Sequence, residues 1–278
     1  MADNATHTAD PVQNPEQQLA TYRERRVLAV TRPQGSLTLV NTQWVDAEQS
    51  VWGVPGIWSP AEGGLRVVAE ASDGIEVDGA LVDGEALVRG KDQPEPSSVR
   101  FSGTVTGFVI AGEGGYALRV WDANSDDVQN FGGIDAYPHN PEWVITAKWS
   151  ENPAGTTLGF EHVKDEGRTR DEVIPGSITF EKDGVDYDLA AFKSGRSLQL
   201  VFADATSGVD TYGVGRFLYV APNADGTITL DFNLAVLPPC AFSYHFNCPM
   251  PPKQNRFSVP IEAGEKNVLN REGGLLHA

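Results

Sequence analysis

Cysteine is scarce in this sequence, with only Cys240 and Cys248 among 278 residues. Two cysteines are too few for a secreted disulfide scaffold, so we expect a reducing compartment and thiols that are free or transiently paired. One local bridge stays open as an alternative. The two residues are near enough in sequence to meet across a hairpin-like loop if their Cα atoms come within roughly 7 Å.

Long apolar runs are also absent. No uninterrupted apolar stretch approaches the ~20 residues that cross a bilayer. The N-terminus from Met1 to Glu16 is polar and acidic, and it lacks the charged-then-apolar pattern of a secretion signal. These observations predict a cytoplasmic protein with no membrane partner.

Positive charge is in short supply, because 21 Lys and Arg face 38 Asp and Glu, giving a formal charge of −17. Such a field repels nucleic acid and anionic membranes, so we expect no nucleic-acid partner. The acidity favours solubility or a salt-tolerant host over an acidic surface for a basic partner protein. The oligomeric state is left open.

The pattern along the chain predicts one helix followed by strands. Residues 1–15 are polar without an apolar period, which predicts a disordered lead. A helix is expected over residues 16–26, with Asn14 as its cap before Pro15. From Val27 onward, short apolar runs, the first at 27–30, alternate with turn formers, which predicts strands joined by tight turns. Asp-Gly pairs at 73–74, 78–79 and 83–84 predict hairpins, as does the turn at 223–226 between strands at 216–220 and 228–232.

No alternation of strands with long helices is present, so a doubly wound α/β fold is disfavoured. The sequence predicts an all-β fold, mainly antiparallel and barrel- or sandwich-like, with a short N-terminal helix. A polar connector over residues 150–172 marks the weakest internal boundary. We therefore expect a helix and β-rich region over residues 16–150 and a second β-rich region over residues 151–278.

Several motifs stand close together in the second region. A Thr-Tyr-Gly-Val-Gly-Arg-Phe run occupies residues 211–217, followed by Asp-Phe-Asn at 231–233, Pro-Pro-Cys-Ala-Phe at 238–242, Cys-Pro-Met-Pro-Pro at 248–252, and Asn255. The prolines fix φ and remove backbone donors, so the cysteine loop can hold one shape without ladder hydrogen bonds. A rigid loop that carries thiols is a candidate site.

These motifs resemble a bacterial and archaeal family catalogued as domain of unknown function 1684. The resemblance covers the second half closely and residues 119–149 more loosely, and it implies no particular reaction. The family pattern usually has an arginine after Asp-Phe-Asn and an asparagine before Pro-Pro, whereas Leu234 and Leu237 stand here. The loss of two polar contacts favours a less polar ligand, or none, for this chain.

Arg216, between Gly215 and Phe217 on a predicted strand, could clamp a carboxylate or phosphate with its five donors. The alternative is a structural ion pair with one of the nearby aspartates, Asp204, Asp210 or Asp231. Asp231 and Asn233 should point to one face of their strand. There they could act as general base and orienting donor, or they could pin the Pro-Pro-Cys loop.

Four roles are open for Cys240: a nucleophile, a metal ligand, a disulfide partner, or a small buried hydrophobic residue. Nucleophilic use would need a lowered pKa from a neighbour such as His245 or His139. A zinc site from Cys240, His245 and Cys248 has unsuitable spacing and lacks a second ligand pair, so no metal is predicted. Tyr137 and His139, on a proline-rich turn, suit a pocket wall, while Trp143 is better explained as core.

The sequence thus predicts a protein that holds a small-molecule ligand in a β-lined pocket and carries out acid-base or hydrolytic chemistry without a cofactor. The alternative is a non-catalytic ligand-binding or structural module. The residues predicted to be catalytic are Asp231, His139 and Cys240. Those predicted to bind substrate are Tyr137, Tyr212, Arg216, Asn233 and Asn255.

Overall fold

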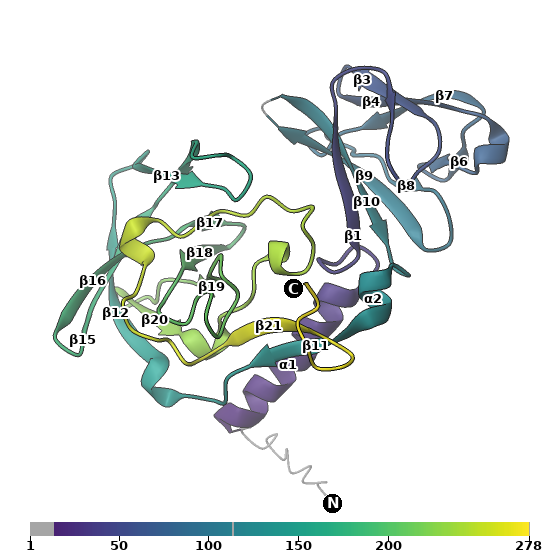
Figure 1. Ribbon diagram of the computed structural model, residues 1–278. Helices are drawn as coiled ribbons and strands as arrows, with labels where there is room; N and C mark the ends of the chain where they lie inside the picture. The colour runs from purple at the N-terminus through teal and green to yellow at the C-terminus, as the bar shows by residue number, and fades with distance from the viewer. Residues whose placement is uncertain (1–13, 113, 278) are drawn as a thin grey trace, which may run out of the picture.

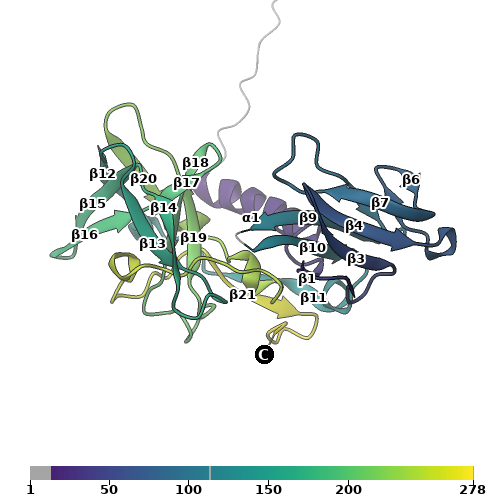
Figure 2. The same cartoon turned by 90° about the horizontal axis from the view of Figure 1, so that it is seen from above.

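A computed structural model describes residues 14–112 and 114–277. Two β-rich lobes lie side by side, with the N-terminal helix running beside the second lobe toward the first (Figures 1 and 2). The strands are antiparallel in every sheet of the described chain. The prediction of a mainly antiparallel, sandwich-like all-β fold with an N-terminal helix is confirmed.

Helix α1 spans Pro15–Thr31 and begins at a capping box. The Asn14 side chain accepts from the Gln17 backbone N–H at 2.8 Å, and the Gln17 side chain accepts from the Asn14 N–H at 3.3 Å. Asn14 and Pro15 therefore belong to the helix start, while residues 1–13 of the predicted disordered lead lie outside the described residues. The helix also continues through Val30, which is buried against the second lobe. The strand predicted at 27–30 is wrong, because packing of this face overrides the β preference of valine.

The first lobe is a sandwich of two sheets. One sheet has the order β1-β10-β9-β8-β5-β6 and the other has the order β2-β3-β4-β7. Their inner faces enclose a core that includes Trp58, Leu65 and Leu118, each fully buried. The strands are β1 (Leu39–Val45), β2 (Gln49–Ser50), β3 (Ile57–Ala61), β4 (Gly64–Ala69), β5 (Glu76–Val77), β6 (Ala80–Leu81), β7 (Gly84–Arg89), β8 (Val99–Arg100), β9 (Val105–Gly112) and β10 (Gly115–Asp122).

The second lobe contains the sheet β16-β15-β12-β20, the sheet β17-β18-β19, and the pairs β13-β14 and β11-β21. Phe202, Phe232 and Phe257 meet edge to face in its core. The strands are β11 (Phe131–Ala136), β12 (Val144–Glu151), β13 (Thr157–Glu161), β14 (Thr169–Val173), β15 (Gly176–Lys182), β16 (Val185–Ala190), β17 (Phe192–Ser194), β18 (Ser197–Phe202), β19 (Arg216–Val220), β20 (Thr227–Asp231) and β21 (Glu265–Asn270).

Short helical turns connect these strands: α2 (Asp126–Asn130), η1 (Ala71–Asp73), η2 (Pro141–Trp143), η3 (Phe232–Leu234), η4 (Pro239–Ala241) and η5 (Lys253–Asn255). Within the described chain, β1–β10 form ladders only with one another, and so do β11–β21. The division predicted near residue 150 falls inside β12 and stays a prediction. No helix among the described residues is both long and apolar enough to cross a bilayer.

The predicted turns have different outcomes. Asp78 and Gly79, with φ of 51° and 82°, join β5 to β6 as a two-residue hairpin. The chain also turns at Asn223, whose N–H donates to the Thr227 carbonyl at 2.8 Å. However, β19 pairs with β18 while β20 pairs with β12, and only Pro222 and Ile228 bridge the two segments. The turn residues set the change of direction, whereas core packing assigns the two strands to different sheets.

Candidate functional site

Arg216, the first residue of β19, is fully buried and paired with Asp204. Its Nη2 donates to the Asp204 carboxylate at 2.7 Å and to the Ile261 carbonyl at 2.9 Å. Its Nη1 donates to the carbonyls of Ala263 and Glu265. Arg216 is therefore a structural residue and not the substrate-binding residue that the sequence predicted, because burial seals its guanidinium away from any ligand.

Asn255 is also fully buried, and it clamps two sheets together. Its Nδ2 donates to the carbonyls of Ala190 on β16 and Val201 on β18, each at 2.8 Å. Its Oδ1 accepts from the Ala190 N–H at 2.9 Å. The amide is saturated by backbone groups, so the predicted role of Asn255 in substrate binding is replaced by a structural one.

Asp231 and Asn233 contact each other, but not from one face of a strand as predicted, because β20 ends at Asp231 and Asn233 lies in η3, which the Asp231 side chain caps. Asp231 Oδ1 accepts from the backbone N–H and from Nδ2 of Asn233, at 3.0 and 2.8 Å. Asn233 also pairs with the backbone of Asn140, accepting from its N–H at 2.7 Å and donating to its carbonyl at 3.0 Å. Asn233 thus fixes the segment before η2 instead of facing a ligand. Asp231 Oδ1 holds Asn233 in this position by accepting its two hydrogen bonds.

Tyr137 and His139 lie on this segment with different surroundings. The Tyr137 hydroxyl donates to the Asp210 carboxylate, and Lys266 Nζ lies 5.0 Å from the centre of the Tyr137 ring. Burial, followed by the hydrogen bond to Asp210, raises the pKa of Tyr137 well above its usual value. His139 is half-buried and has no hydrogen bond or ion pair with the described residues. Neither residue lines the cavity described below.

Cys240 and Cys248 are free, buried and adjacent. The Cys240 N–H donates to Cys248 Sγ at 3.2 Å. The hydrogen bond between the thiols lowers the pKa of Cys240 and, with burial, raises that of Cys248. No histidine among the described residues hydrogen-bonds to either thiol, so the pairing that would make Cys240 a His-activated nucleophile is missing. This geometry agrees with the role of Cys240 as a small buried hydrophobic residue.

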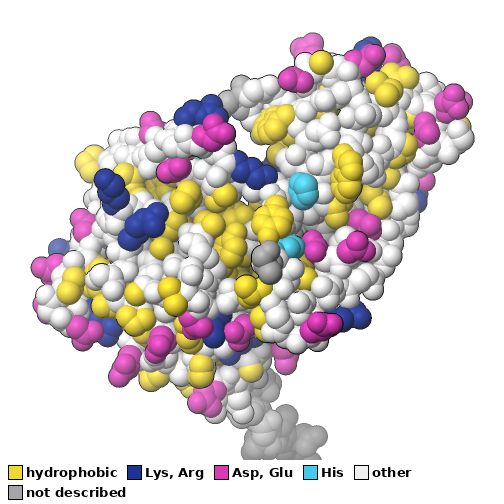
Figure 3. All heavy atoms as spheres, in the orientation of Figure 1, with side chains coloured by type: hydrophobic (Ala, Val, Ile, Leu, Met, Phe, Trp, Pro, Cys, Tyr) yellow, Lys and Arg dark blue, Asp and Glu magenta, His cyan; other side chains and the backbone are white. Residues whose placement is uncertain are grey.

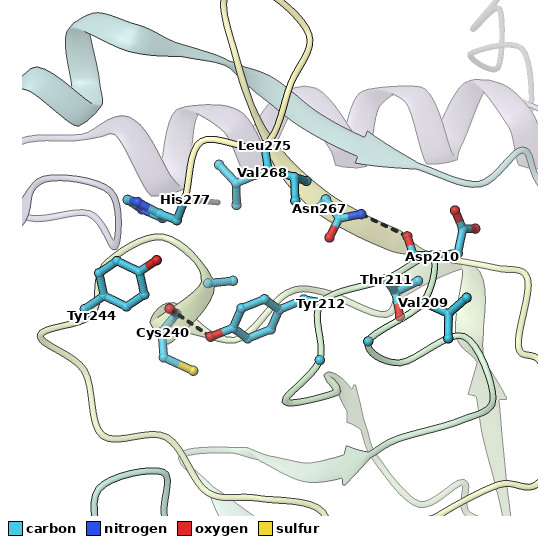
Figure 4. Close-up of a pocket in the computed structure, with 13 residues that line it drawn as sticks. Val209, Asp210, Thr211, Tyr212, Cys240, Tyr244, Asn267, Val268, Leu275 and His277 are labelled. Atoms are coloured by element: carbon cyan, nitrogen blue, oxygen red, sulfur yellow. Dashed lines mark hydrogen bonds between the residues drawn. The ribbon is translucent and has the colours of Figure 1, made fainter.

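A cavity of about 250 Å³ opens beside the same loop. Figure 4 shows one wall formed by β21 and the C-terminal segment, and the facing wall by the cysteine loop and residues 208–213. Tyr212 reaches across the floor, where its hydroxyl donates to the Cys240 carbonyl at 3.1 Å. The Cys240 sulfur is directed away from Tyr244 and His277. The backbone of Cys240, more than its thiol, therefore lines the cavity.

Tyr244 and His277 form the aromatic end of the cavity, with ring centres 4.9 Å apart. His277 Nε2 lies 3.1 Å from the Phe242 carbonyl. Since a carbonyl only accepts, Nε2 carries the proton, and Nδ1 of the neutral ring is left as an acceptor. Asn267 donates through Nδ2 to the Asp210 carbonyl at 2.9 Å, which leaves its Oδ1 as a second acceptor.

Asp210 lies at the other end of the cavity, and both of its carboxylate oxygens are already bonded, one by the Tyr137 hydroxyl and one by Lys266 Nζ. Hydrogen bonds from Tyr137 and then from Lys266 lower the pKa of Asp210, so it is ionised at neutral pH. Lys266 Nζ lies 3.2 Å from this carboxylate and 3.2 Å from that of Asp135. The lining thus offers acceptors on His277 and Asn267, with aromatic and aliphatic surface between them.

Of the eight predicted site residues, the structure brings only Tyr212 and Cys240 to this cavity. Sequence reasoning missed Tyr244, Asn267 and His277, which belong to none of the motifs. The exposed tyrosine and the lone histidine carried no spacing signal, because they meet only after β21 returns beside the cysteine loop. In the described part of the chain, no three His, Cys, Asp or Glu side chains are grouped to hold a metal ion.

Comparison with known proteins places the motifs in a family. The profile of a family described as protein of unknown function (DUF1684) matches residues 129–266. An uncharacterized protein of Haloarcula marismortui, solved by NMR in solution, is 33% identical, with 49% of this chain and 77% of that chain covered and a TM-score of 0.40. No curated protein matches.

Proposed function

This chain belongs to the family described as protein of unknown function (DUF1684), and we propose that it binds a small, flat molecule that carries hydrogen-bond donors. The observation that supports this proposal is the cavity between Tyr212, Tyr244 and His277, which offers aromatic surface and unfilled acceptors together. A binding module is favoured over acid-base or hydrolytic catalysis, because no nucleophile and base among the described residues lie within hydrogen-bond reach of each other there.

The size and charge of the cavity restrict the ligand further. At ~30 Å³ for each water molecule, about 250 Å³ corresponds to roughly eight waters, which suits a ligand of one ring with a short polar group. His277 Nδ1 and Asn267 Oδ1 can accept hydrogen bonds from a ligand. The described lining contains no Lys or Arg, which also disfavours an anion at this site. A neutral or cationic ligand is therefore proposed.

A cytoplasmic location is part of the proposal. It is supported by the low cysteine content and by two buried thiols that are adjacent yet free. A small metabolite of that compartment is the kind of partner we infer.

Calorimetric titration with benzamidine, benzamide and benzoate tests the proposal. All three have one ring, but only the first two offer N–H donors. We expect binding of benzamidine and benzamide, and weaker or undetectable binding of benzoate. Tyr244→Ala should weaken binding, whereas Tyr219→Ala, which changes a partly exposed tyrosine on β19, should leave it unchanged. Equal affinity for benzoate, or equal loss in the two variants, would contradict the proposal.

A further inference from the structure

A second cavity, of about 470 Å³, lies between the lobes and carries a concentration of positive charge. Four of the 21 basic residues line it, namely Arg26, Arg32, Lys91 and Arg119, and no Asp or Glu is found among the described residues of its lining. Figure 3 shows Lys or Arg side chains in the hollow between the two lobes. In a protein of net charge −17, this local excess calls for a physical explanation.

Three of the four cations in this cavity are not neutralised by the described part of the protein. Arg26 is paired with Glu265 at 2.7 Å. Arg32, Lys91 and Arg119 have no carboxylate partner among the described residues. At physiological ionic strength the Debye length is about 8 Å, so distant acidic residues are screened while these cations act directly on a bound group. The site therefore attracts an anion locally.

The walls of the cavity contain two buried donors without acceptors, Arg119 Nε and Trp121 Nε1. Trp121 is 7% exposed. Both residues stand on β10 two positions apart, so they face the same side of the sheet, away from the sandwich core that contains Leu118 and Val120. Buried donors are nearly always satisfied, and an oxyanion in the cavity would supply the missing acceptors.

Apolar surface next to the cations indicates more than a bare ion. Arg119 lies 5.1 Å from the centre of the Phe246 ring, which comes from the cysteine loop. Phe108 on β9 is the cross-strand neighbour of Arg119, and Ile110 follows on the same face. The volume lies within the range of about 300–1,000 Å³ that is usual for small-molecule sites. An organic group can therefore pack beside the charged one.

We propose that this cavity binds a small organic phosphate, with the phosphoryl group held by Arg119, Lys91 and Arg32 and the organic part against Phe246. Three uncompensated cations match a doubly charged phosphoryl group better than a singly charged carboxylate. The net negative field disfavours a long polyanion such as nucleic acid. This site is separate from the cavity at Tyr212 and does not depend on its ligand.

Titration calorimetry with phenyl phosphate at low salt tests the site, with inorganic phosphate and benzoate as comparison probes. Phenyl phosphate should bind more tightly than either and weaken as NaCl is added. Arg119→Gln should weaken binding about tenfold or more, because it removes a charged hydrogen bond. Trp121→Phe keeps a smaller aromatic side chain and removes the indole N–H donor, and should weaken binding about threefold to tenfold.

Two further variants keep this test decisive. Arg32 is exposed, so Arg32→Gln should fold normally and weaken phenyl phosphate binding roughly twofold to fivefold. Arg66→Gln, on β4 in the other sheet of the first lobe, is the matched control and should change nothing. No binding of phenyl phosphate at millimolar concentration, equal binding of benzoate, or equal affinities of the Arg32 and Arg66 variants would overturn the proposal.

Discussion

Arg216→Ala should be among the most damaging single substitutions in the second lobe. The change removes the partner of a buried carboxylate and leaves Asp204 with hydrogen bonds from Thr206 and Ile261 but no opposite charge. It also leaves the carbonyls of Ile261 and Ala263 without the donors they now use. Breaking a buried ion pair by removing one partner costs about 3–5 kcal/mol of unfolding free energy.

Urea unfolding followed by circular dichroism measures this cost. With a slope of roughly 3 kcal/mol per molar urea, a loss of 3–5 kcal/mol lowers the midpoint by about 1–1.7 M. Arg66→Ala is the matched control, since Arg66 is 47% exposed and lies 3.6 Å from Glu85. An exposed pair of this kind contributes about 0–1 kcal/mol. If both variants shift the midpoint equally, Arg216 is not the buried anchor described above.

Three other substitutions or treatments follow from the same contacts. Asn255→Ala should lower the unfolding free energy by about 2–4 kcal/mol, because three buried backbone groups lose their partners. Hydrogen exchange of the Ala190 amide should become faster. Unchanged exchange would contradict the role of Asn255 in joining the two sheets. Hydrogen bonds, first from Arg170 and then from Asn247, hold the pKa of Asp165 at about 2, below its unfolded value of ~3.9. The ionised Asp165 therefore stabilises the folded protein fully above pH ~4, and this stabilisation is lost as the pH falls through about 2. Asp165→Asn should therefore be less stable than the parent protein at pH 4, and the difference in unfolding free energy should shrink as the pH falls to 2. A difference that stays constant over this range would contradict the role of the ionised Asp165 carboxylate. A thiol reagent should titrate both cysteines in urea and react far more slowly in the native protein, while fast native labelling would contradict their burial.

Local signals in the sequence were sufficient where one contact decides the structure. Asn14 and Pro15 specify the helix start, and Asp78-Gly79 specifies a hairpin, because each depends on neighbours within a few residues. The Asp-Gly pairs at 73–74 and 83–84 join strands of different sheets, so the hairpins predicted there are wrong. The alternation of short apolar runs with turn residues likewise predicted the antiparallel β architecture. These features do not require knowledge of what packs against them.

The site could not be predicted in the same way, because the identity of a polar residue does not reveal whether its side chain contacts a ligand or a backbone carbonyl. Arg216 and Asn255 fit a binding motif in the sequence, yet both are buried in the fold and hydrogen-bonded to protein groups. The reverse holds for Tyr244 and His277, which stand outside every motif and meet only through the tertiary fold. Burial and long-range contacts separate the two cases.

Chemical-shift mapping with benzamidine on isotopically labelled protein tests most directly whether the ligand site lies at the Tyr212 cavity. Binding there should move the backbone amide signals of Asp210, Asn267 and His277 in a saturable manner, because these residues line opposite sides of the cavity. Signals of His139 and Asp231 should stay in place. Saturable shifts centred on His139 and Asp231, with none at the cavity, would contradict the assignment of the site.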